Sequence, residues 1–374
     1  MSASELVGYC TNIHPGVSLD QVKSNLDRFA CEIKQRVSPN VSMPIGLWLA
    51  NETCQQLGQS ELLAFRDWLD DRGLLPFTLN GFPFGNFHQK VVKHDVYKPT
   101  WADPSRLNYT TALARNLSVL VRSELRFATI STLPLGWPPG DEAFLSNCAK
   151  HLTLCATELE KIRDETGVHI MLCMEPEPGC ILDTADDVVK FFDQYVDSRS
   201  REFIGVCHDV CHSAVMFESQ RTAIETYRAN SIRIGKCQVS SALETHFTEA
   251  NADSQTLSAE LYKFHEPRYL HQTCVQHEDA SVEFFEDLDQ AFQLNTTKQG
   301  IWRTHFHVPI YAESVGKLGT TQNEIFEFLT HRDDQQMHFE IETYAWDVLP
   351  DDASNIDVQT NIEREIQWFT KALS

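Results

Sequence analysis

The sequence lacks the features of a membrane or secreted protein. No uncharged apolar stretch approaches the ~20 residues that a membrane-spanning helix needs. The N-terminus, MSASELVGYC, has no basic region followed by a long apolar run, which a secretory signal peptide would show. The 11 cysteines form no CxxC pair, and an odd count with scattered spacing is not typical of a disulfide framework. We therefore expect a cytoplasmic protein in a reducing compartment, without a membrane span.

Positive charge is scarce. Lys and Arg number 31 against 53 Asp and Glu, which gives a net charge of −22. A surface of this sign repels phosphate backbones, so we expect no nucleic-acid partner. A small anionic substrate is not excluded, because a few local cations can hold it. The expected partner is a small molecule, and the composition indicates no particular oligomeric state.

The chain also lacks Gly/Ser linkers and low-complexity tracts, so we expect one domain over residues 1–374. Short apolar runs alternate with amphipathic helical patterns, which is typical of a parallel sheet. Eight such units in a chain of 374 residues predict a closed (β/α)8 TIM barrel. The predicted barrel strands lie within residues 6–12, 45–50, 75–81, 127–134, 169–175, 204–210, 232–240 and 337–346.

The interval between the last two predicted strands is irregular. From Gln238 to His338 it is about twice the usual length, with two helical patterns and a strand-like segment, RTHFHVPIY, at residues 303–311. We interpret residues 244–331 as an elaborated region within the barrel domain that forms a lid or wall over the barrel mouth. A ninth barrel strand is the alternative.

The stretch VHIMLCMEPEPGC, residues 168–180, ends an apolar strand on a charge. Pro176 cannot donate a hydrogen bond to a sheet, so it marks the strand's end and leaves Glu175 at its carboxyl end. A carboxylate that loses water there must be paired, bind a metal or raise its pKa. Parallel barrels place their active sites at this end of the strands. The other polar residues at predicted strand ends are Asn12, His14, Asn80, His88, Ser131, Thr132, Glu177, Asp209, His212, Gln238, Ser240, Glu340 and Glu342.

Strands five to eight contribute three carboxylates and a carboxamide to this end of the barrel. They come from Glu175, Asp209, Gln238 and an acid of the eighth strand, and their side chains should point toward one axis. Three carboxylates so close would repel one another unless a cation lay between them. Oxygen ligands favour Mn²⁺ or Mg²⁺, and Zn²⁺ becomes the alternative if His212 or another histidine joins.

These strand ends resemble those of the xylose-isomerase-like barrels, in EP after the fifth strand, DVCH after the sixth and an acid after the eighth. That superfamily includes sugar isomerases, ketose 3-epimerases, inosose dehydratases and endonuclease IV. The epimerases have histidine where Gln238 stands. The resemblance otherwise implies that four residues bind the metal, namely Glu175, Asp209, Gln238 and Glu342. It also implies that His212 binds substrate, as in the epimerases, or metal, as in endonuclease IV.

Ten dispersed motifs over nearly the whole chain resemble the EboE family of metabolite traffic proteins: GYCTNIHPG, TLNGFPFGNFH, STLPLGW, MEPEPGC, DVCHSAV, GKCQVSSAL, EPRYLHQT, HFHVPIY, LGTTQ and ETYAWDVLP. Members of that family accompany genes for secondary-metabolite production, including a prenyltransferase and an enzyme similar to sugar-phosphate cyclases. The resemblance therefore implies a role in the production or traffic of a secondary metabolite.

Gln238 raises the question of a further ligand, since an amide oxygen binds late transition metals less well than imidazole does. His305 and His307 are spaced so that they share one face of a strand, as an HxH ligand pair would. The alternative is that both hold the lid through hydrogen bonds. His271 is a third candidate, with Arg268 nearby as an anion clamp.

The predicted chemistry is metal-assisted isomerisation or epimerisation of a polyol, sugar phosphate or cyclitol. Glu175 and Glu342 would remove and return the proton through a metal-bound enediolate. The predicted substrate-binding residues are Asn12, His88, His212, Arg268, His271, His305 and Lys236, of which Lys236 would otherwise form a structural ion pair. The two alternatives are non-catalytic metabolite binding and a zinc-dependent phosphoester hydrolase of the endonuclease-IV type, with ligands from His212, His305 and His307.

Overall fold

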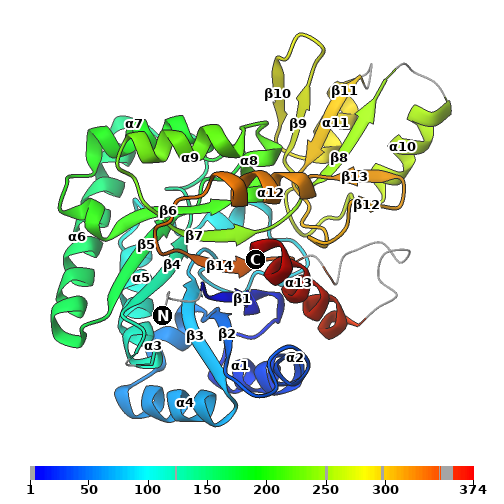
Figure 1. Ribbon diagram of the computed structural model, residues 1–374. Coiled ribbons are helices and arrows are strands. Elements are labelled where there is room, and N and C mark those ends of the chain that lie inside the picture. The colour runs from blue at the N-terminus through cyan, green and yellow to red at the C-terminus, as the bar shows by residue number, and fades with distance from the viewer. Residues whose placement is uncertain (1–4, 123, 249–251, 296–298, 345, 347–356) are drawn as a thin grey trace.

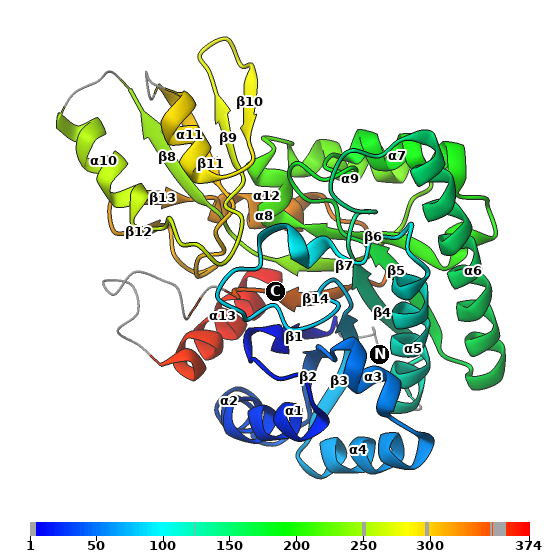
Figure 2. The ribbon, with the colours of Figure 1, turned by 180° about the vertical axis from the view of Figure 1, so that it is seen from behind.

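The computed structural model describes residues 5–122, 124–248, 252–295, 299–344, 346 and 357–374. Eight strands form one sheet: β1 (Val7–Tyr9), β2 (Met43–Leu47), β3 (Leu74–Asn80), β4 (Phe127–Thr132), β5 (His169–Met174), β6 (Ile204–Asp209), β7 (Ile234–Val239) and β14 (His338–Ile341). They are parallel, in the order β1-β14-β7-β6-β5-β4-β3-β2 (Figures 1 and 2). An isolated parallel bridge between Cys10 and Gly46 joins the two edges, so the sheet closes. The predicted (β/α)8 barrel is confirmed.

Helices surround the barrel (Figure 1). The longest, α6, begins after Asp141, whose side chain accepts a hydrogen bond from Phe144 N, and ends at Gly167, which takes φ +73°. Within the described residues, every helix is too short or too polar to cross a membrane. The barrel helices are α1 (Leu19–Asn25), α2 (Cys31–Val37), α3 (Asn51–Gln56), α4 (Gln59–Asp71), α5 (Pro104–Leu120), α6 (Glu142–Thr166), α7 (Ala185–Tyr195), α8 (Val210–Val215), α9 (Gln220–Ala229), α12 (Gln322–His331) and α13 (Val358–Leu373).

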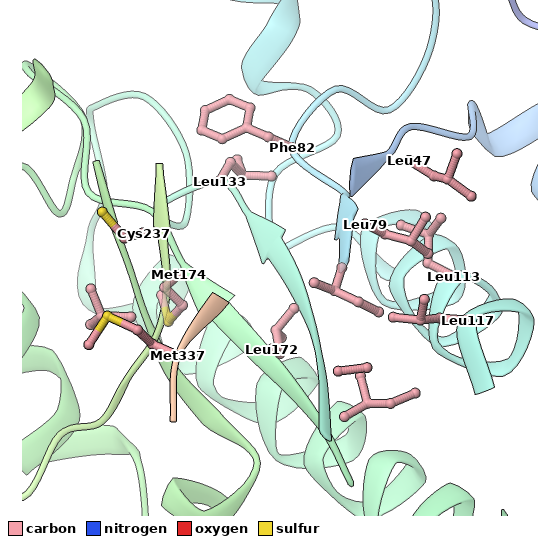
Figure 3. Close-up of a cluster of buried hydrophobic side chains, with 14 of the residues drawn as sticks. Leu47, Leu79, Phe82, Leu113, Leu117, Leu133, Leu172, Met174, Cys237 and Met337 are labelled. Atoms are coloured by element: carbon pink, nitrogen blue, oxygen red, sulfur yellow. The ribbon is translucent and has the colours of Figure 1, made fainter. Parts of the chain in front are cut away.

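The core lies between the barrel wall and these helices. Figure 3 shows Leu79 of β3 beside Leu113 and Leu117 of α5, and all three side chains are fully buried. Strands that are covered by helices on the outside and by their own side chains on the inside are largely apolar on both faces. This explains the short continuous apolar runs of the sequence, and it makes the polar residues at the strand ends exceptional.

A second sheet follows β7 in the chain and precedes β14. It has six antiparallel strands in the order β10-β9-β11-β8-β13-β12, and we call it the insertion sheet. It stands to one side of the barrel next to α8 and α12 in both views (Figures 1 and 2). Its elements are β8 (Leu243–Phe247), α10 (Ala252–Tyr262), β9 (Thr273–Gln276), β10 (Val282–Phe285), α11 (Leu288–Leu294), β11 (Gly300–Thr304), β12 (Ser314–Val315) and β13 (Leu318–Thr320).

The insertion sheet differs from the expectation of one strand-like segment at residues 303–311. The strand there, β11, ends at Thr304, and the chain then leaves the sheet: His305 N bonds to Gln272 O, and Val308 N bonds to Ser241 O. Pro309 has no N–H with which to continue a ladder. The alternative of a ninth barrel strand is wrong, because β8 to β13 pair only with one another among the described strands.

Glu365 of α13 ties the segment after β11 to the barrel. Its buried side chain accepts hydrogen bonds from Thr343 Oγ1 at 2.6 Å and from Ile310 N at 3.2 Å. Burial raises the pKa of Glu365 from 4.5 to about 8. The folded protein therefore keeps a proton that the unfolded chain has lost, and this group lowers the stability progressively as the pH rises from 4.5 to about 8.

We expect Glu365→Gln to remove that loss, because glutamine keeps an acceptor oxygen and has no titrating proton. Calorimetry should show the variant melting several degrees above the wild type at about pH 9 and within about 2 °C of it at about pH 5. Glu363→Gln, a more exposed position on the same helix, is the control. No gain at the higher pH would contradict a buried, protonated Glu365.

Candidate metal centre and cavity

Three carboxylates meet at the carboxyl ends of the barrel strands. Glu175 follows β5, Asp209 ends β6 and Glu342 follows β14, and their relative exposures are only 3%, 2% and 5%. One oxygen from each carboxylate lies within 4.8 Å of the other two. The structure thus brings together three of the four residues predicted to bind the metal.

Gln238 is the fourth. It lies in β7 opposite Asp209 of β6, and directly paired residues of neighbouring strands point to the same side of a sheet. The side chain is completely buried, and neither its Oε1 nor its Nε2 has a hydrogen-bond partner among the described residues. A buried amide without hydrogen-bond partners costs free energy, so the lone pair of Gln238 Oε1 is suited to bind a cation.

Hydrogen bonds occupy one oxygen of two of these carboxylates. Glu342 Oε1 accepts from Asn12 Nδ2 at 2.7 Å and from Asn80 Nδ2 at 2.9 Å. Asp209 Oδ1 accepts from His212 N at 3.0 Å, which caps α8, and from Ser240 Oγ at 2.7 Å.

Other oxygens of the cluster are left over. Asp209 Oδ2 and Glu175 Oε2 are buried and have no hydrogen-bond partner in the described part of the chain. Oriented carboxylates with leftover lone pairs are the donor set that a divalent cation requires. The residues present therefore fit a bound metal ion.

The pKa values show how strongly the acids interact. Burial and the neighbouring carboxylates Glu342 and Asp209 raise the pKa of Glu175 well above its ordinary value. Burial and Asp209 raise the pKa of Glu342 to about 8. Burial also disfavours ionised Asp209, but His212, His307 and the Ser240 hydrogen bond outweigh it and lower the pKa of Asp209. Without a cation, three ionised carboxylates do not coexist here.

A cavity of about 90 Å³ opens above this cluster. Its polar part is formed by Asn12, Asn80, Glu175, Glu177, His212, His305, His307 and Glu342. Its apolar part is formed largely by aromatic side chains, with Phe82, Pro83, Phe87, Val96, Tyr97, Tyr269, Leu270 and Tyr344. The cavity therefore offers both oxygen and nitrogen ligands and aromatic surfaces on which a ring can stack.

The only Lys or Arg among the described residues that line the cavity is Lys93. Its ammonium group forms an ion pair with Asp287. Arg268, predicted as an anion clamp, does not line the cavity: its backbone N–H bonds to Glu266, and its guanidinium carbon lies 5.7 Å from the centre of the Tyr269 ring. The side chains that line this cavity thus include no positive charge that lacks a carboxylate partner.

Three other predicted substrate-binding residues lie outside the cavity wall. Lys236 forms the alternative structural ion pair, with its Nζ 2.6 Å from Glu340 Oε2 inside the barrel. Gly46 leaves room for that pair, since a Cβ there would lie 1.4 Å from Glu340 Oε1. His271 bonds through Nε2 to a Glu266 oxygen at 3.2 Å. His88 Nε2 lies 2.7 Å from Asn12 O and so supports Asn12 from behind.

Two residues to which the sequence assigned no role, Glu177 and Gln272, organise the part of the cavity wall that carries the histidines. Glu177 Oε1 accepts hydrogen bonds from Tyr97 Oη at 2.7 Å and from Gln272 Nε2 at 3.0 Å, and Gln272 Oε1 lies 2.8 Å from His305 Nδ1. Gln272 stands directly after His271 in the motif EPRYLHQT. An uncharged amide beside a histidine gives little indication of a role unless the direction of both side chains is known.

No protein-family model matches the sequence, and no curated protein matches it. Solved structures do match. A xylose isomerase-like TIM barrel protein from Mycobacterium smegmatis in complex with magnesium has a TM-score of 0.54 at 12% identity, over 99% of this chain and 98% of that chain. D-psicose 3-epimerase in the presence of D-fructose gives 0.53 at 12%, over 98% and 99%. L-ribulose 3-epimerase gives 0.51 at 11%, over 98% and 94%. This chain therefore has a xylose-isomerase-like TIM-barrel fold.

Proposed function

We propose that this protein is a divalent-metal-dependent isomerase or epimerase that acts on an uncharged sugar, polyol or cyclitol. The observation that carries the proposal is the convergence of Glu175, Asp209 and Glu342, which are buried and incompletely hydrogen-bonded, next to a cavity lined partly by aromatic side chains. Two similar structures are of sugar 3-epimerases, which agrees with this chemistry. The proposal includes a role in the production or traffic of a secondary metabolite, which the resemblance of the motifs to the EboE family implies. It also includes a cytoplasmic location, which 11 unpaired cysteines suit.

Glu175, Asp209, Gln238 and Glu342 would hold the metal, and the oxygen-rich donor set favours Mn²⁺ or Mg²⁺, with Zn²⁺ as the alternative. When bound, such a cation polarises a carbonyl and its neighbouring hydroxyl and so acidifies the C–H bond between them. Glu342 is oriented for proton transfer by the amides of Asn12 and Asn80. Glu175, which comes from a strand on another part of the barrel wall, would act at the other face of the same carbon.

The cavity favours an uncharged substrate over a sugar phosphate. Lys93, the one Lys or Arg among the described residues of the cavity wall, is neutralised by Asp287, whereas phosphate recognition needs charge-assisted donors. The walls instead match an apolar or ring-shaped part of the substrate, which can stack on Phe82, Phe87 or Tyr97. The same lack of available positive charge disfavours the phosphoester hydrolase, so non-catalytic binding is the competing function that an experiment must separate.

Solvent exchange tests the proposal without knowledge of the natural substrate. The Mn²⁺-loaded protein is incubated in D₂O with D-fructose, L-ribulose and a keto-inositol, and NMR follows loss of the proton on the carbon next to the carbonyl. We expect exchange with at least one of the three, abolished by removal of the metal with a chelator. No exchange with any probe, combined with measurable binding of one of them, would favour a carrier over an enzyme.

A further inference from the structure

We propose that residues 85–96 form a lid that opens to admit a ligand to the cavity, and that the ion pair between Lys93 and Asp287 is its latch. The lid belongs to the chain between β3 and α5, which is the cyan segment of Figure 2. The inference goes beyond the proposed function, because it concerns entry to the cavity and holds for an enzyme and for a carrier alike.

The cavity is small while the lid is closed. Its volume is about 90 Å³, whereas pockets that bind small-molecule ligands enclose about 300–1,000 Å³. Three side chains of the lid, those of Phe87, Lys93 and Val96, belong to the cavity wall. Movement of the lid would therefore take away part of this wall and widen the cavity.

Both ends of the lid are anchored to the barrel through Arg106 of α5. This side chain is completely buried, and its guanidinium donates hydrogen bonds to Gly81 O at 2.8 Å and to Phe82 O at 2.9 Å, before the lid. It also donates to Pro99 O at 2.9 Å, after the lid. The rigid fork of a guanidinium can hold several carbonyls in place at once. Motion is thus confined to the residues between these anchors.

The lid itself has little regular structure. Residues 85–92, all of which the structure describes, form neither helix nor strand, and the short 3₁₀-helix η3 (Lys93–Tyr97) follows. Lys93 takes φ +38°, in the left-handed region that favours glycine, so local strain opposes the closed position. A small apolar cluster, separate from the main core, packs the lid onto its surroundings and consists of Trp48, Ala50, Phe87, Val92 and Tyr269. Segments of this kind open at a lower free energy than the core does.

The closed lid is bound to the region between β8 and α11. Val92 N and Lys93 N both donate to Arg268 O, at 2.7 and 3.0 Å. His94 Nε2 lies 3.0 Å from Glu286 Oε1, but both side chains are more than a third exposed, so this pair contributes little. These contacts place the lid against a part of the chain that is far away in the sequence.

The ion pair of Lys93 is the strongest candidate for a latch. Asp287 is fixed at the start of α11, where its Oδ1 accepts from Leu288 N at 2.9 Å and from His271 N at 3.3 Å. Its other oxygen, Oδ2, pairs with the Lys93 ammonium group. The two side chains are 31% and 12% exposed, so solvent screens the pair less than it screens a surface pair. Opening the lid must break this contact.

Hydrogen exchange measures the opening without any ligand. The amide hydrogens of Val92 and Lys93 are bonded to Arg268 O in the closed lid, so they exchange with solvent when the lid opens. Mass spectrometry with fragmentation resolves single amides, and rates are corrected for the local sequence. We expect both amides to exchange about tenfold or more faster than that of Trp101, which bonds to Leu135 O beyond the anchored end.

Asp287→Asn tests the latch, because asparagine can still cap α11 but carries no charge. Exchange of the two lid amides should rise about 5- to 30-fold, the change that one charged contact makes to an equilibrium, while Trp101 is unaffected. Lys93→Met added to this variant should change the rate by less than about twofold, since both changes break the same pair. Asp95→Asn, which breaks an exposed pair with Lys98, is the matched control and should also stay within about twofold of the wild type.

A thiol in the cavity wall tests entry. Leu270→Cys places a cysteine at a buried wall position outside the lid, and mass spectrometry follows its reaction with iodoacetamide. We expect Asp287→Asn to speed this labelling by about the same 5- to 30-fold as the amide exchange. An equal labelling rate with and without Asp287→Asn would overturn the role of the lid in entry.

The wild type alone also decides whether the lid opens. Exchange of the Val92 and Lys93 amides as slow as that of Trp101 would overturn the lid, and equal exchange in the wild type and Asp287→Asn would overturn the latch. None of these measurements needs a bound metal or turnover. Failure of the proposed function would appear as absence of substrate proton exchange and would leave the amide and thiol results unchanged.

Discussion

Glu342→Gln should lower the rate of solvent exchange or turnover by about 100- to 10,000-fold, the range that a positioned proton-transfer group contributes. Glutamine has nearly the same shape and can still accept the hydrogen bonds of Asn12 and Asn80 through its oxygen. It carries no negative charge and cannot take a proton from carbon. The effect should therefore be on kcat with the fold intact, measured by NMR exchange and by the melting temperature.

The control for this change is Glu218→Gln. Glu218 is another largely buried acid, whose Oε1 accepts a hydrogen bond from Ala185 N at 2.9 Å, and it does not line the cavity. Its replacement should leave the rate unchanged. Turnover by Glu342→Gln at the wild-type rate would contradict the assignment of Glu342. If neither the wild type nor Glu342→Gln shows turnover and both bind ligand with the same affinity, the protein is a metabolite carrier.

Asp209→Asn should reduce the bound Mn²⁺ or Mg²⁺ from about one equivalent to a small fraction. Asparagine keeps an oxygen that can cap α8 at His212 N and accept from Ser240 Oγ, so local structure should survive. What is lost is the negative charge and the unpartnered Oδ2. Elemental analysis of the protein purified without chelator measures the loss, and Asp209→Ala should show the same loss together with a lower melting temperature.

Ser240→Ala provides a graded comparison for Asp209. It removes the donor to Oδ1 and keeps the carboxylate, so it should weaken metal binding by about 10- to 100-fold, the range for residues that orient a ligand. Metal content that is equal in the wild type, Asp209→Asn and Ser240→Ala would mean that any bound ion lies elsewhere in the protein.

The sequence was sufficient to predict the barrel and the position of its acids. Parallel strands covered on both faces leave continuous apolar runs, and Glu175, Asp209 and Glu342 stand where those runs end. The carboxyl ends of all eight strands face one side of a barrel, so the fold class alone predicts that these three acids lie close together. They are separated by up to 167 positions in the sequence, and their carboxylate oxygens lie within 4.8 Å of one another.

The insertion sheet could not be predicted in the same way. Its strands β9 and β10 have four residues each, and three of the four residues of β10 are exposed, so neither strand shows a long apolar run or a regular alternation. Their pairing depends on contacts between distant segments, such as Trp302 of β11 with Val275 of β9. The sequence pattern predicted only one strand of this sheet, at residues 303–311, and that prediction continues beyond Thr304, where β11 ends.

Side-chain direction limited the prediction of the cavity. Arg268 and His271 precede the cavity residue Gln272 closely in the sequence, but their side chains contact Tyr269 and Glu266. The side chain of Gln272 contacts His305 instead. His305 and His307 lie next to each other, as their spacing predicted, but not on a strand, where that prediction put them. Which ring nitrogen carries the proton depends on partners that only the fold brings together.

Anomalous diffraction from crystals loaded with Mn²⁺ tests most directly whether the buried acids exist to hold a cation. The account predicts one strong peak surrounded by oxygens of Glu175, Asp209, Gln238 and Glu342, absent in Asp209→Asn. A map without a peak at that position, with the three carboxylates protonated and bonded to one another, would contradict the metal centre and the chemistry proposed from it.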